Sequence, residues 1–117
     1  MFHCSCDNCQ RTTGTGHSSV VLFHSDALRI VGATKSYSRP ADSGATFTRH
    51  FCPECGTTVV AQSSRAPALR IVPAGIFAGH NEWFEPNQLI FSRSHQAWDL
   101  VEDHLPRHQT YRQEDTQ

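Results

Sequence analysis

The sequence lacks any long apolar run, and none approaches the roughly 20 residues that a membrane-spanning helix needs. The first residues, Met1 to Cys4, carry neither the basic stretch nor the apolar stretch of a secretory signal. A surplus of basic residues is absent as well. Lys and Arg number 10 against 11 Asp and Glu, so the formal net charge of -1 provides no overall basic field to recruit nucleic acid. We therefore expect a cytoplasmic protein whose partner is neither a membrane nor a nucleic acid.

Helical periodicity is also scarce, and this scarcity favours an all-β fold. Only Gln96–Leu105 has apolar residues at helix-compatible spacing, with Pro106 to end the helix. Elsewhere, short β-branched or alternating segments between turns predict strands. The predicted strands are Ser18–Phe23, Ala27–Val31, Lys35–Ser38, Thr46–Phe51, Thr57–Gln62, Leu69–Gly75 and Leu89–Ser92. We predict an all-β fold of small antiparallel sheets with one short C-terminal helix.

The length of the chain bounds the number of domains. A chain of 117 residues, 38% of them hydrophobic, can bury one modest core but not two. We therefore expect a single domain over residues 1–106. From Arg107 the sequence is polar and charged, so residues 107–117 are expected to form a frayed tail.

All five cysteines fall into two short clusters with the spacing of metal ligands. Cys4, Cys6 and Cys9 form C-x-C-x-x-C, and Cys52 and Cys55 form C-x-x-C before a glycine. Without a secretory signal, such tight spacing favours a metal, above all zinc, over a disulfide framework. Buried structural thiols are the other alternative, but these usually lie scattered along strands. Because predicted strands lead into and out of the second cluster, we expect it at the tip of a β-hairpin, as in zinc ribbons.

Three thiolates would leave one position open on a tetrahedral zinc ion, as in catalytic sites. Such a site could polarise an aldehyde oxygen or keep a bound thiol ionised at neutral pH. Its negative charge calls for nearby donors, and Arg11 and Arg49 are the nearest candidates by motif position. Gln10–Gly16, rich in Thr and Gly, is predicted to be a loop whose backbone can approach a ligand. His3 and His17 are candidates for a fourth ligand or a proton shuttle, although most histidines are surface residues.

These motifs resemble the sequence pattern of the glutathione-dependent formaldehyde-activating enzyme family, which also includes centromere protein V. The matching segments are CSCDNCQRTTG, RHFCPECGTTV, VPAGIF and, near the C-terminus, RSHQAWDLVEDHLP. The resemblance covers the chain from His3 to about Pro106, and the segments occur in the order that the family has. The family implies a β-tent (Mss4-like) fold of small antiparallel sheets with a zinc-ribbon-like knuckle.

The resemblance also implies the ligands of the metal. Cys4, Cys6 and Cys9 correspond to the trio that holds zinc at the active site of the family. Cys52 and Cys55 correspond to half of a structural zinc site, whose other two ligands come from an earlier C-x-C-G hairpin. The implied cofactor is Zn²⁺, with one ion expected and two allowed.

This sequence departs from the family because the earlier C-x-C-G motif is missing from it. One reading is that Met1 is an internal start and a first hairpin is missing. A second reading is that the site of Cys52 and Cys55 is degenerate and empty. A third is that the clusters converge on one shared zinc, for example Cys4 and Cys6 with Cys52 and Cys55.

The resemblance implies an enzyme, a carbon-sulfur lyase that forms S-hydroxymethylglutathione or a similar thiol-aldehyde adduct, or cleaves it. The catalytic residues expected are Cys4, Cys6 and Cys9, with Arg11 beside them, and the partners are a small thiol such as glutathione and an aldehyde. Two alternatives remain open. The first is a zinc-stabilised binding module without catalysis, since a fold alone does not fix function. The second is a redox sensor whose clustered thiolates oxidise and release zinc.

Overall fold

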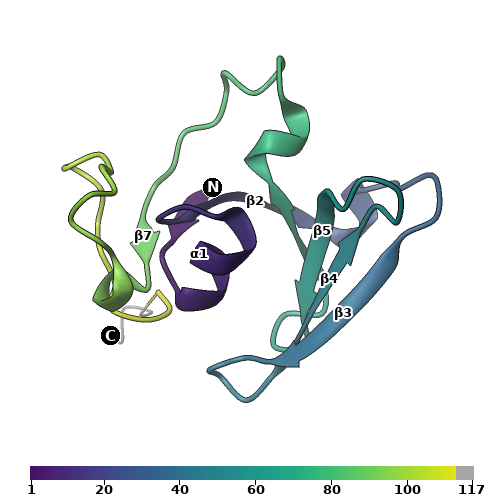
Figure 1. The fold of residues 1–117 in the computed structure, drawn as a ribbon, viewed down its shortest axis with the longest axis horizontal. Helices are drawn as coiled ribbons and strands as arrows, with labels where there is room; N and C mark the ends of the chain where they lie inside the picture. The colour runs from purple at the N-terminus through teal and green to yellow at the C-terminus, as the bar shows by residue number, and fades with distance from the viewer. Residues whose placement is uncertain (113–117) are drawn as a thin grey trace. The chain divides into compact units, whose positions relative to one another are not determined.

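The structure is a computed structural model that describes residues 1–112, and these form seven strands and one short α-helix (Figure 1). This arrangement confirms the predicted all-β class. The chain divides into two compact units. Among the described residues, the first comprises Met1–Val20 together with residues 77–112, and the second comprises Val21–Ile76. The expected single domain over residues 1–106 stays a prediction.

The first unit is built on β1 (Phe2–Cys4), which pairs on both sides. It runs antiparallel to the start of β2 (Ser18–His24) and parallel to β7 (Leu89–Ile90). Between β1 and β2 lies the helix α1 (Asp7–Thr13). Leu89, on β7, is fully buried and lies at the core of this unit.

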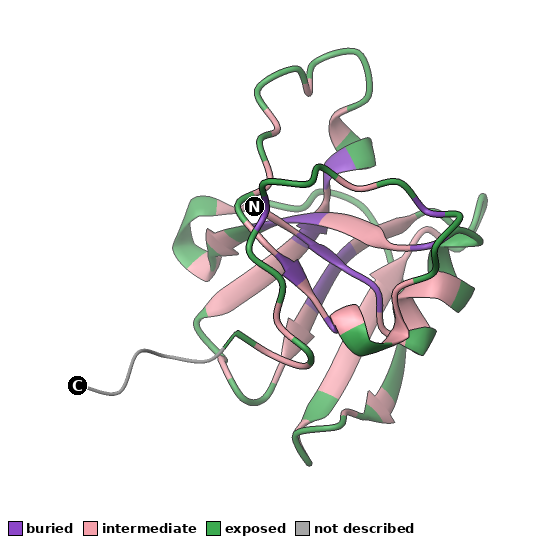
Figure 2. Ribbon diagram, turned by 90° about the vertical axis from the view of Figure 1, so that its left-hand side faces the viewer, coloured by how far each residue is buried: buried purple, intermediate pink, exposed green. Residues whose placement is uncertain are grey.

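The second unit consists of consecutive antiparallel neighbours, which lie side by side in Figure 1. Its strands are β3 (Lys35–Pro40), β4 (Thr46–Phe51), β5 (Thr58–Ser63) and β6 (Leu69–Pro73). Val60, Ala61 and Val72 form its buried core, and the buried residues in Figure 2 lie mainly on strands. The turn between β4 and β5 carries Cys52 and Cys55, so the prediction of a cysteine knuckle at a hairpin tip is confirmed.

The predicted strand Ala27–Val31 is wrong. The chain forms the 3-10 helix η1 (Ser25–Ala27) and continues without regular structure, with Val31 almost fully exposed. The reason is local, because the Nδ1 atom of His24 accepts a hydrogen bond from the backbone of Asp26 at 3.4 Å and starts a turn. The alternating residues 28–31, which follow this turn, belong to no strand of the sheet.

The predicted C-terminal helix at Gln96–Leu105 is also wrong, since that segment consists of turns. Its apolar side chains do not share a buried face: Leu105 is buried, whereas Trp98 and Leu100 are 65% and 90% exposed. The single α-helix among residues 1–112 is α1, which overlaps the segment predicted as a loop, Gln10–Gly16. Only the last part of that segment, after Thr13, is a turn.

Two other predicted strands end early. Leu69–Gly75 leaves the sheet after Pro73 and continues as the 3-10 helix η2 (Ala74–Phe77). Leu89–Ser92 is a strand for two residues only, because Phe91 adopts a left-handed conformation (φ 56°). The 3-10 helix η3 (Ser92–Ser94) follows it.

The start of the expected tail is joined to β7. Arg107 forms a parallel bridge with Leu89, and Thr110 accepts a hydrogen bond from the backbone N–H of Phe91 at 2.9 Å. The rest of the expected tail, residues 113–117, lies outside the described residues.

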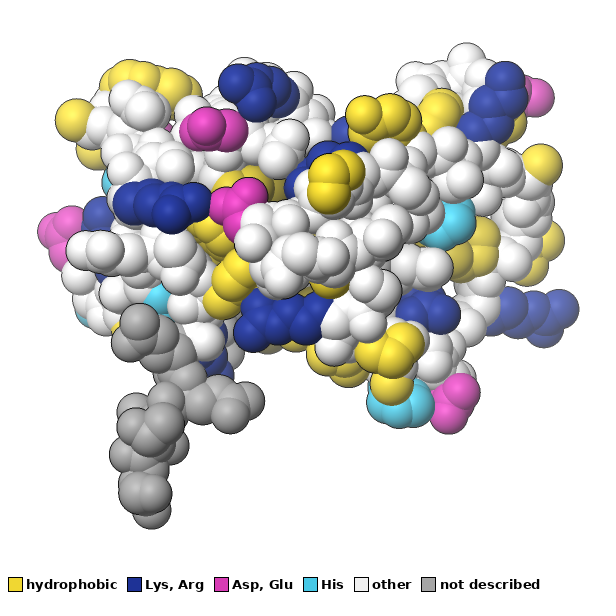
Figure 3. Space-filling model, turned by 90° about the horizontal axis from the view of Figure 1, so that it is seen from below, with side chains coloured by type: hydrophobic (Ala, Val, Ile, Leu, Met, Phe, Trp, Pro, Cys, Tyr) yellow, Lys and Arg dark blue, Asp and Glu magenta, His cyan; other side chains and the backbone are white. Residues whose placement is uncertain are grey.

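The described residues include no helix long and apolar enough to cross a membrane. Lys and Arg side chains are spread over the face shown in Figure 3, with Asp and Glu side chains among them. Mixed charges on this face agree with the nearly balanced composition.

Candidate metal centre

Three cysteines of the first unit converge on one point. The Sγ atoms of Cys4, Cys6 and Cys9 all lie within 4.8 Å of one another, and among residues 1–112 they are the one group of three or more side chains that could hold a metal ion. Thiolates about 2.3 Å from a tetrahedral zinc are about 3.8 Å apart. A small inward movement of the three side chains therefore suffices to hold a metal.

The C-x-C-x-x-C spacing brings the three thiols together because each lies at a different point of the passage from strand to helix. Cys4 ends β1 and is buried, Cys6 is the N-cap of α1, and Cys9 lies in the first turn of the helix. The backbone N–H of Cys9 donates to the Sγ atom of Cys6 at 3.3 Å, as an N-cap side chain requires. Gly14 ends the helix in the left-handed conformation (φ 73°), which glycine adopts at little cost.

Gln10 fixes the backbone between the cysteines. Its Nε2 atom donates to the carbonyl of Ser5 at 2.9 Å and to the carbonyl of Ser94 at 3.0 Å. The N–H of Ser5 donates to the carbonyl of Ile90, at the end of β7. These bonds hold the connection from β1 to α1 from both sides.

Gln10→Ala is expected to weaken zinc binding by the trio about 10-fold, since side chains that orient metal ligands typically contribute that much. The loss of two hydrogen bonds should also lower the free energy of unfolding by about 1–2 kcal/mol. Competition with a chromophoric zinc chelator measures the affinity.

A matched control is Gln96→Ala, because exposed Gln96 also donates to the carbonyl of Ser94, at 3.2 Å. If both variants bound zinc equally well, Gln10 would have no special role at the cluster.

The crowding of three thiols raises the pKa of Cys4 far above its usual range, through hydrogen bonds with Cys6 and Cys9 and through burial. For Cys9, the hydrogen bond with Cys4 lowers the pKa, but the bond with Cys6 and burial outweigh it and raise the pKa to about 11. Cys4 and Cys9 therefore resist ionisation unless a cation compensates their charge. A divalent metal ion would displace the protons and supply that charge, so the donor set fits zinc.

Ser18 belongs to this cluster, and the sequence analysis missed it. It faces Cys4 in the ladder of β1 and β2, and its side chain hydrogen-bonds the thiol of Cys9, which lowers the pKa of that thiol. The only signal in the sequence is alternation along the strand, which becomes informative once the register is known.

The expected charge partners lie elsewhere. Arg11 is exposed in the last turn of α1, and it follows Cys9 by two positions, which on a helix point in different directions. Arg49 belongs to β4 in the second unit, where its guanidinium lies 6.0 Å from the centre of the Tyr37 ring.

His3 is directed away from the cysteine cluster. Successive side chains of a strand point to opposite faces, so His3 and Cys4 lie on different sides of β1. The Nδ1 atom of His3 is 2.9 Å from Ser19 Oγ, and its Nε2 atom is 3.4 Å from Glu102. Burial, and then the neighbouring His17, lower the pKa of His3, which favours a neutral ring. Both ring nitrogens of His3 therefore contact side chains other than the three thiols.

A second polar cluster surrounds Asp99, which the sequence analysis did not single out. Its Oδ2 atom lies 2.6 Å from the Nδ1 atom of His17 and 3.4 Å from the Nε2 atom of His95. Asp99 is only 9% exposed, and it packs directly on Gly16. The rings of His17 and His3 are 4.3 Å apart. These contacts hold the segment that carries Asp99 against the turn that follows α1.

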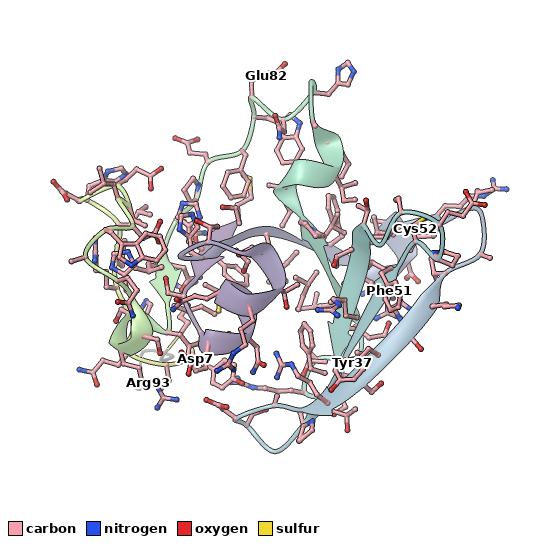
Figure 4. The ribbon with its side chains drawn as sticks, viewed as in Figure 1. Asp7, Tyr37, Phe51, Cys52, Glu82 and Arg93 are labelled. Atoms are coloured by element: carbon pink, nitrogen blue, oxygen red, sulfur yellow. The ribbon has the colours of Figure 1, made fainter. Side chains whose placement is uncertain are left out.

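Cys52 and Cys55 are in the second unit. Cys52 follows Phe51 at the end of β4 (Figure 4), and Cys55 is exposed. Hydrogen bonds from the hydroxyl and the backbone of Thr57 lower the pKa of Cys55. Within the described part of the chain, this pair joins no cluster of three or more ligand side chains. A closed structural zinc site has four protein ligands, so the pair by itself does not fit one.

Comparison with known families gives one match. A family model described as glutathione-dependent formaldehyde-activating enzyme matches residues 1–94. No curated protein matches the chain. The matched range contains both cysteine clusters and ends at Ser94, whose carbonyl accepts the hydrogen bond from Gln10.

Proposed function

The chain belongs to the glutathione-dependent formaldehyde-activating enzyme family, and on that basis we propose that it is a zinc-dependent carbon-sulfur lyase. Its reaction is the formation or cleavage of S-hydroxymethylglutathione, or of a similar adduct between a small thiol and an aldehyde. The observation that carries the proposal is the convergence of three thiols, which no fourth ligand side chain joins among residues 1–112. An open position is typical of a catalytic zinc rather than a structural one.

Cys4, Cys6 and Cys9 would hold the ion. When bound, zinc supplies a Lewis acid that polarises an aldehyde oxygen or keeps a thiol ionised. In the forward reaction a bond forms between the sulfur of the thiol and the aldehyde carbon, and the thiol proton passes to the aldehyde oxygen. The hydroxyl of Ser18 restrains Cys9 beside this reaction, and Gln10 fixes the backbone around the ligands.

Arg11 has a role in this proposal that differs from the one expected from the sequence. It is exposed, so it suits the attraction of an anionic substrate better than contact with the reacting atoms. Glutathione carries two carboxylates and one ammonium group at neutral pH, and an exposed cation favours its approach.

Arg11→Ala is expected to raise KM for glutathione about 3-fold and to leave kcat nearly unchanged, since the lost attraction is exposed to solvent. Steady-state kinetics at low ionic strength measures both constants. Arg11→Lys retains the charge and should restore KM. An equal fall of kcat in both variants would instead place Arg11 at the reacting atoms.

The test of the function is the rate of adduct formation. The zinc-loaded chain is mixed with glutathione and formaldehyde, and exchange between free and adduct signals is followed by nuclear magnetic resonance. Acceleration over the uncatalysed reaction supports the lyase. A zinc-loaded chain that leaves the rate unchanged would point to a binding module, and loss of zinc on mild oxidation would point to a redox sensor.

The cytoplasm is part of the same proposal. All five cysteines are free in the structure, and a reducing compartment keeps clustered thiols in that state.

A further inference from the structure

Positive charge is concentrated in the second unit of the chain. Val21–Ile76 contains six Lys and Arg against three Asp and Glu, whereas the rest of the sequence contains four against eight. The formal charges are therefore +3 and -4, which together give the net charge of -1. The expectation that nucleic acid is not a partner is based on the charge of the whole chain, which hides this division. The second unit by itself can attract an anionic partner.

Cations and aromatic rings of this unit share one face of the two strands β3 and β4. Every second residue of a strand belongs to the same face, and the register puts a cation opposite an aromatic ring at three alternate positions. The pairs are Lys35 with Phe51, Tyr37 with Arg49, and Arg39 with Phe47. We call these six residues the cation–aromatic face. The other face of the two strands carries only Ser, Thr, His and Pro, and neither strand contains Asp or Glu.

Stacking contacts order the cation–aromatic face. The guanidinium carbon of Arg39 lies 4.7 Å from the centre of the Phe47 ring, and that of Arg49 lies 6.0 Å from the centre of the Tyr37 ring. Arg39 uses one N–H to donate to the carbonyl of Pro40 at 3.3 Å, and a guanidinium has five such donors. Stacking therefore fixes the guanidinium of Arg39, while its other donors can still bind an anion.

Tyr37 is the ring of this face that is most open to a ligand. It is 58% exposed, whereas Phe47 and Phe51 are only partly exposed. Lys35 and Arg39 lie two residues to either side of Tyr37 on β3, so about 13 Å of strand separates the two cations. A planar group stacked on Tyr37 would therefore have a cation at each end.

We propose that the cation–aromatic face binds single-stranded nucleic acid without sequence preference. A base stacks on Tyr37, and the phosphates on either side of that base contact Lys35 and Arg39. Proteins that bind single strands combine a row of cations with aromatic rings in this way. The proposal concerns the second unit alone, and it does not depend on the proposed lyase activity.

The ring between the cations distinguishes this partner from other anions. An acidic peptide would satisfy Lys35 and Arg39 equally well, but its carboxylates bring no planar group to stack on Tyr37. A nucleotide carries a base beside every phosphate, so it uses the ring and the cations together. A duplex fits less well, because its bases are already paired and stacked on one another.

The experiment mixes the zinc-loaded chain with a fluorescein-labelled oligothymidylate of about 15 nucleotides and follows binding by fluorescence anisotropy. At low salt we expect a Kd on the order of 100 µM, at the weak end of non-specific binding. A plot of the logarithm of the association constant against the logarithm of the salt concentration should have a slope of about -1.4, for two phosphate contacts with a single strand. A duplex of the same length should bind more weakly.

Tyr37→Ala should weaken binding about 10-fold, the loss of one stacked base, and Tyr37→Phe should restore it. Arg39→Gln should make the salt slope shallower by about 0.7, the share of one phosphate contact. Arg93→Gln is the matched control, because Arg93 also lies over a ring, 5.4 Å from the centre of Phe91, but in the first unit. This variant should bind like the unmodified chain. The comparison of Arg39→Gln with Arg93→Gln stays decisive even if Tyr37→Ala fails to fold.

Four results would overturn the proposal. The first is an anisotropy that stays unchanged up to about 1 mM protein, ten times the expected Kd. The second is an equal loss of binding in Arg93→Gln and Arg39→Gln, which would reduce the attraction to a general effect of charge. The third is a duplex that binds as tightly as the single strand. The fourth is a polyglutamate peptide of equal charge that binds as tightly as the oligothymidylate, which would assign the face to acidic peptides.

Discussion

Cys6→Ser is expected to lose the zinc of the trio and to reduce lyase activity about 100-fold or more, because two thiolates replace three around the ion. The fold should survive. Cys6 is the N-cap of α1 and accepts a hydrogen bond from Cys9, and serine is among the preferred N-cap residues. The substitution therefore removes a ligand and keeps the cap. Zinc per chain by elemental analysis and adduct formation by nuclear magnetic resonance are the two readouts.

The comparison is cleanest in a chain whose second cysteine pair, Cys52 and Cys55, has been replaced and so cannot bind zinc. Cys52→Ser/Cys55→Ser should retain about one zinc per chain, and adding Cys6→Ser should remove it. If the triple variant kept its zinc, the trio would not be the metal centre. If the activity persisted without zinc, the proposed role of the metal would be wrong.

Gly16→Ala is expected to lower the free energy of unfolding by about 2–3 kcal/mol, the cost of overpacking a filled site. A Cβ atom at Gly16 would clash with the Cγ and Cβ atoms of Asp99. Asp99 cannot swing away freely, because it is buried and lies 2.6 Å from the Nδ1 atom of His17. Urea unfolding followed by circular dichroism measures the change.

Gly75→Ala is the control, since a Cβ atom there meets nothing within 4 Å. The clash also predicts non-additivity. Asp99→Ala removes the obstructing side chain, so the double variant Gly16→Ala/Asp99→Ala should lose less stability than the sum of the two changes. Equal effects of Gly16→Ala and Gly75→Ala would contradict the close packing of Asp99 on the turn after α1.

Local patterns were enough to predict the knuckle. Alternating residues before Cys52 and after Gly56 predict two strands, and a C-x-x-C between them predicts the turn. The strand Thr46–Phe51 has the predicted bounds. The convergence of the trio also followed from spacing, since C-x-C-x-x-C leaves little chain between the thiols.

The errors lie where a distant partner or a single cap decides the structure. Thr and Gly after Cys9 indicate a loop, but the cap from Cys6 and the ending at Gly14 stabilise a short helix. The segment around Asp99 has helical spacing, yet contacts with His17 and Gly16 hold it in turns. Such contacts span more than 80 residues of sequence and leave no periodic signal.

The partners of the trio were hidden for the same reason. Ser18 reaches Cys9 because the register of β1 and β2 places it opposite Cys4. His3, adjacent to Cys4 in sequence, points to the other face of the strand and contacts Ser19 and Glu102. Adjacency in sequence and adjacency in the site are therefore different things on a strand.

The most direct test of the account is X-ray absorption at the zinc edge for the Cys52→Ser/Cys55→Ser chain. The account predicts an ion with three sulfur neighbours at about 2.3 Å and one lighter atom at about 2.0 Å, the pattern of an open three-cysteine site. Failure of this variant to bind zinc would contradict it, because the ion would then require the knuckle and would not belong to Cys4, Cys6 and Cys9 alone.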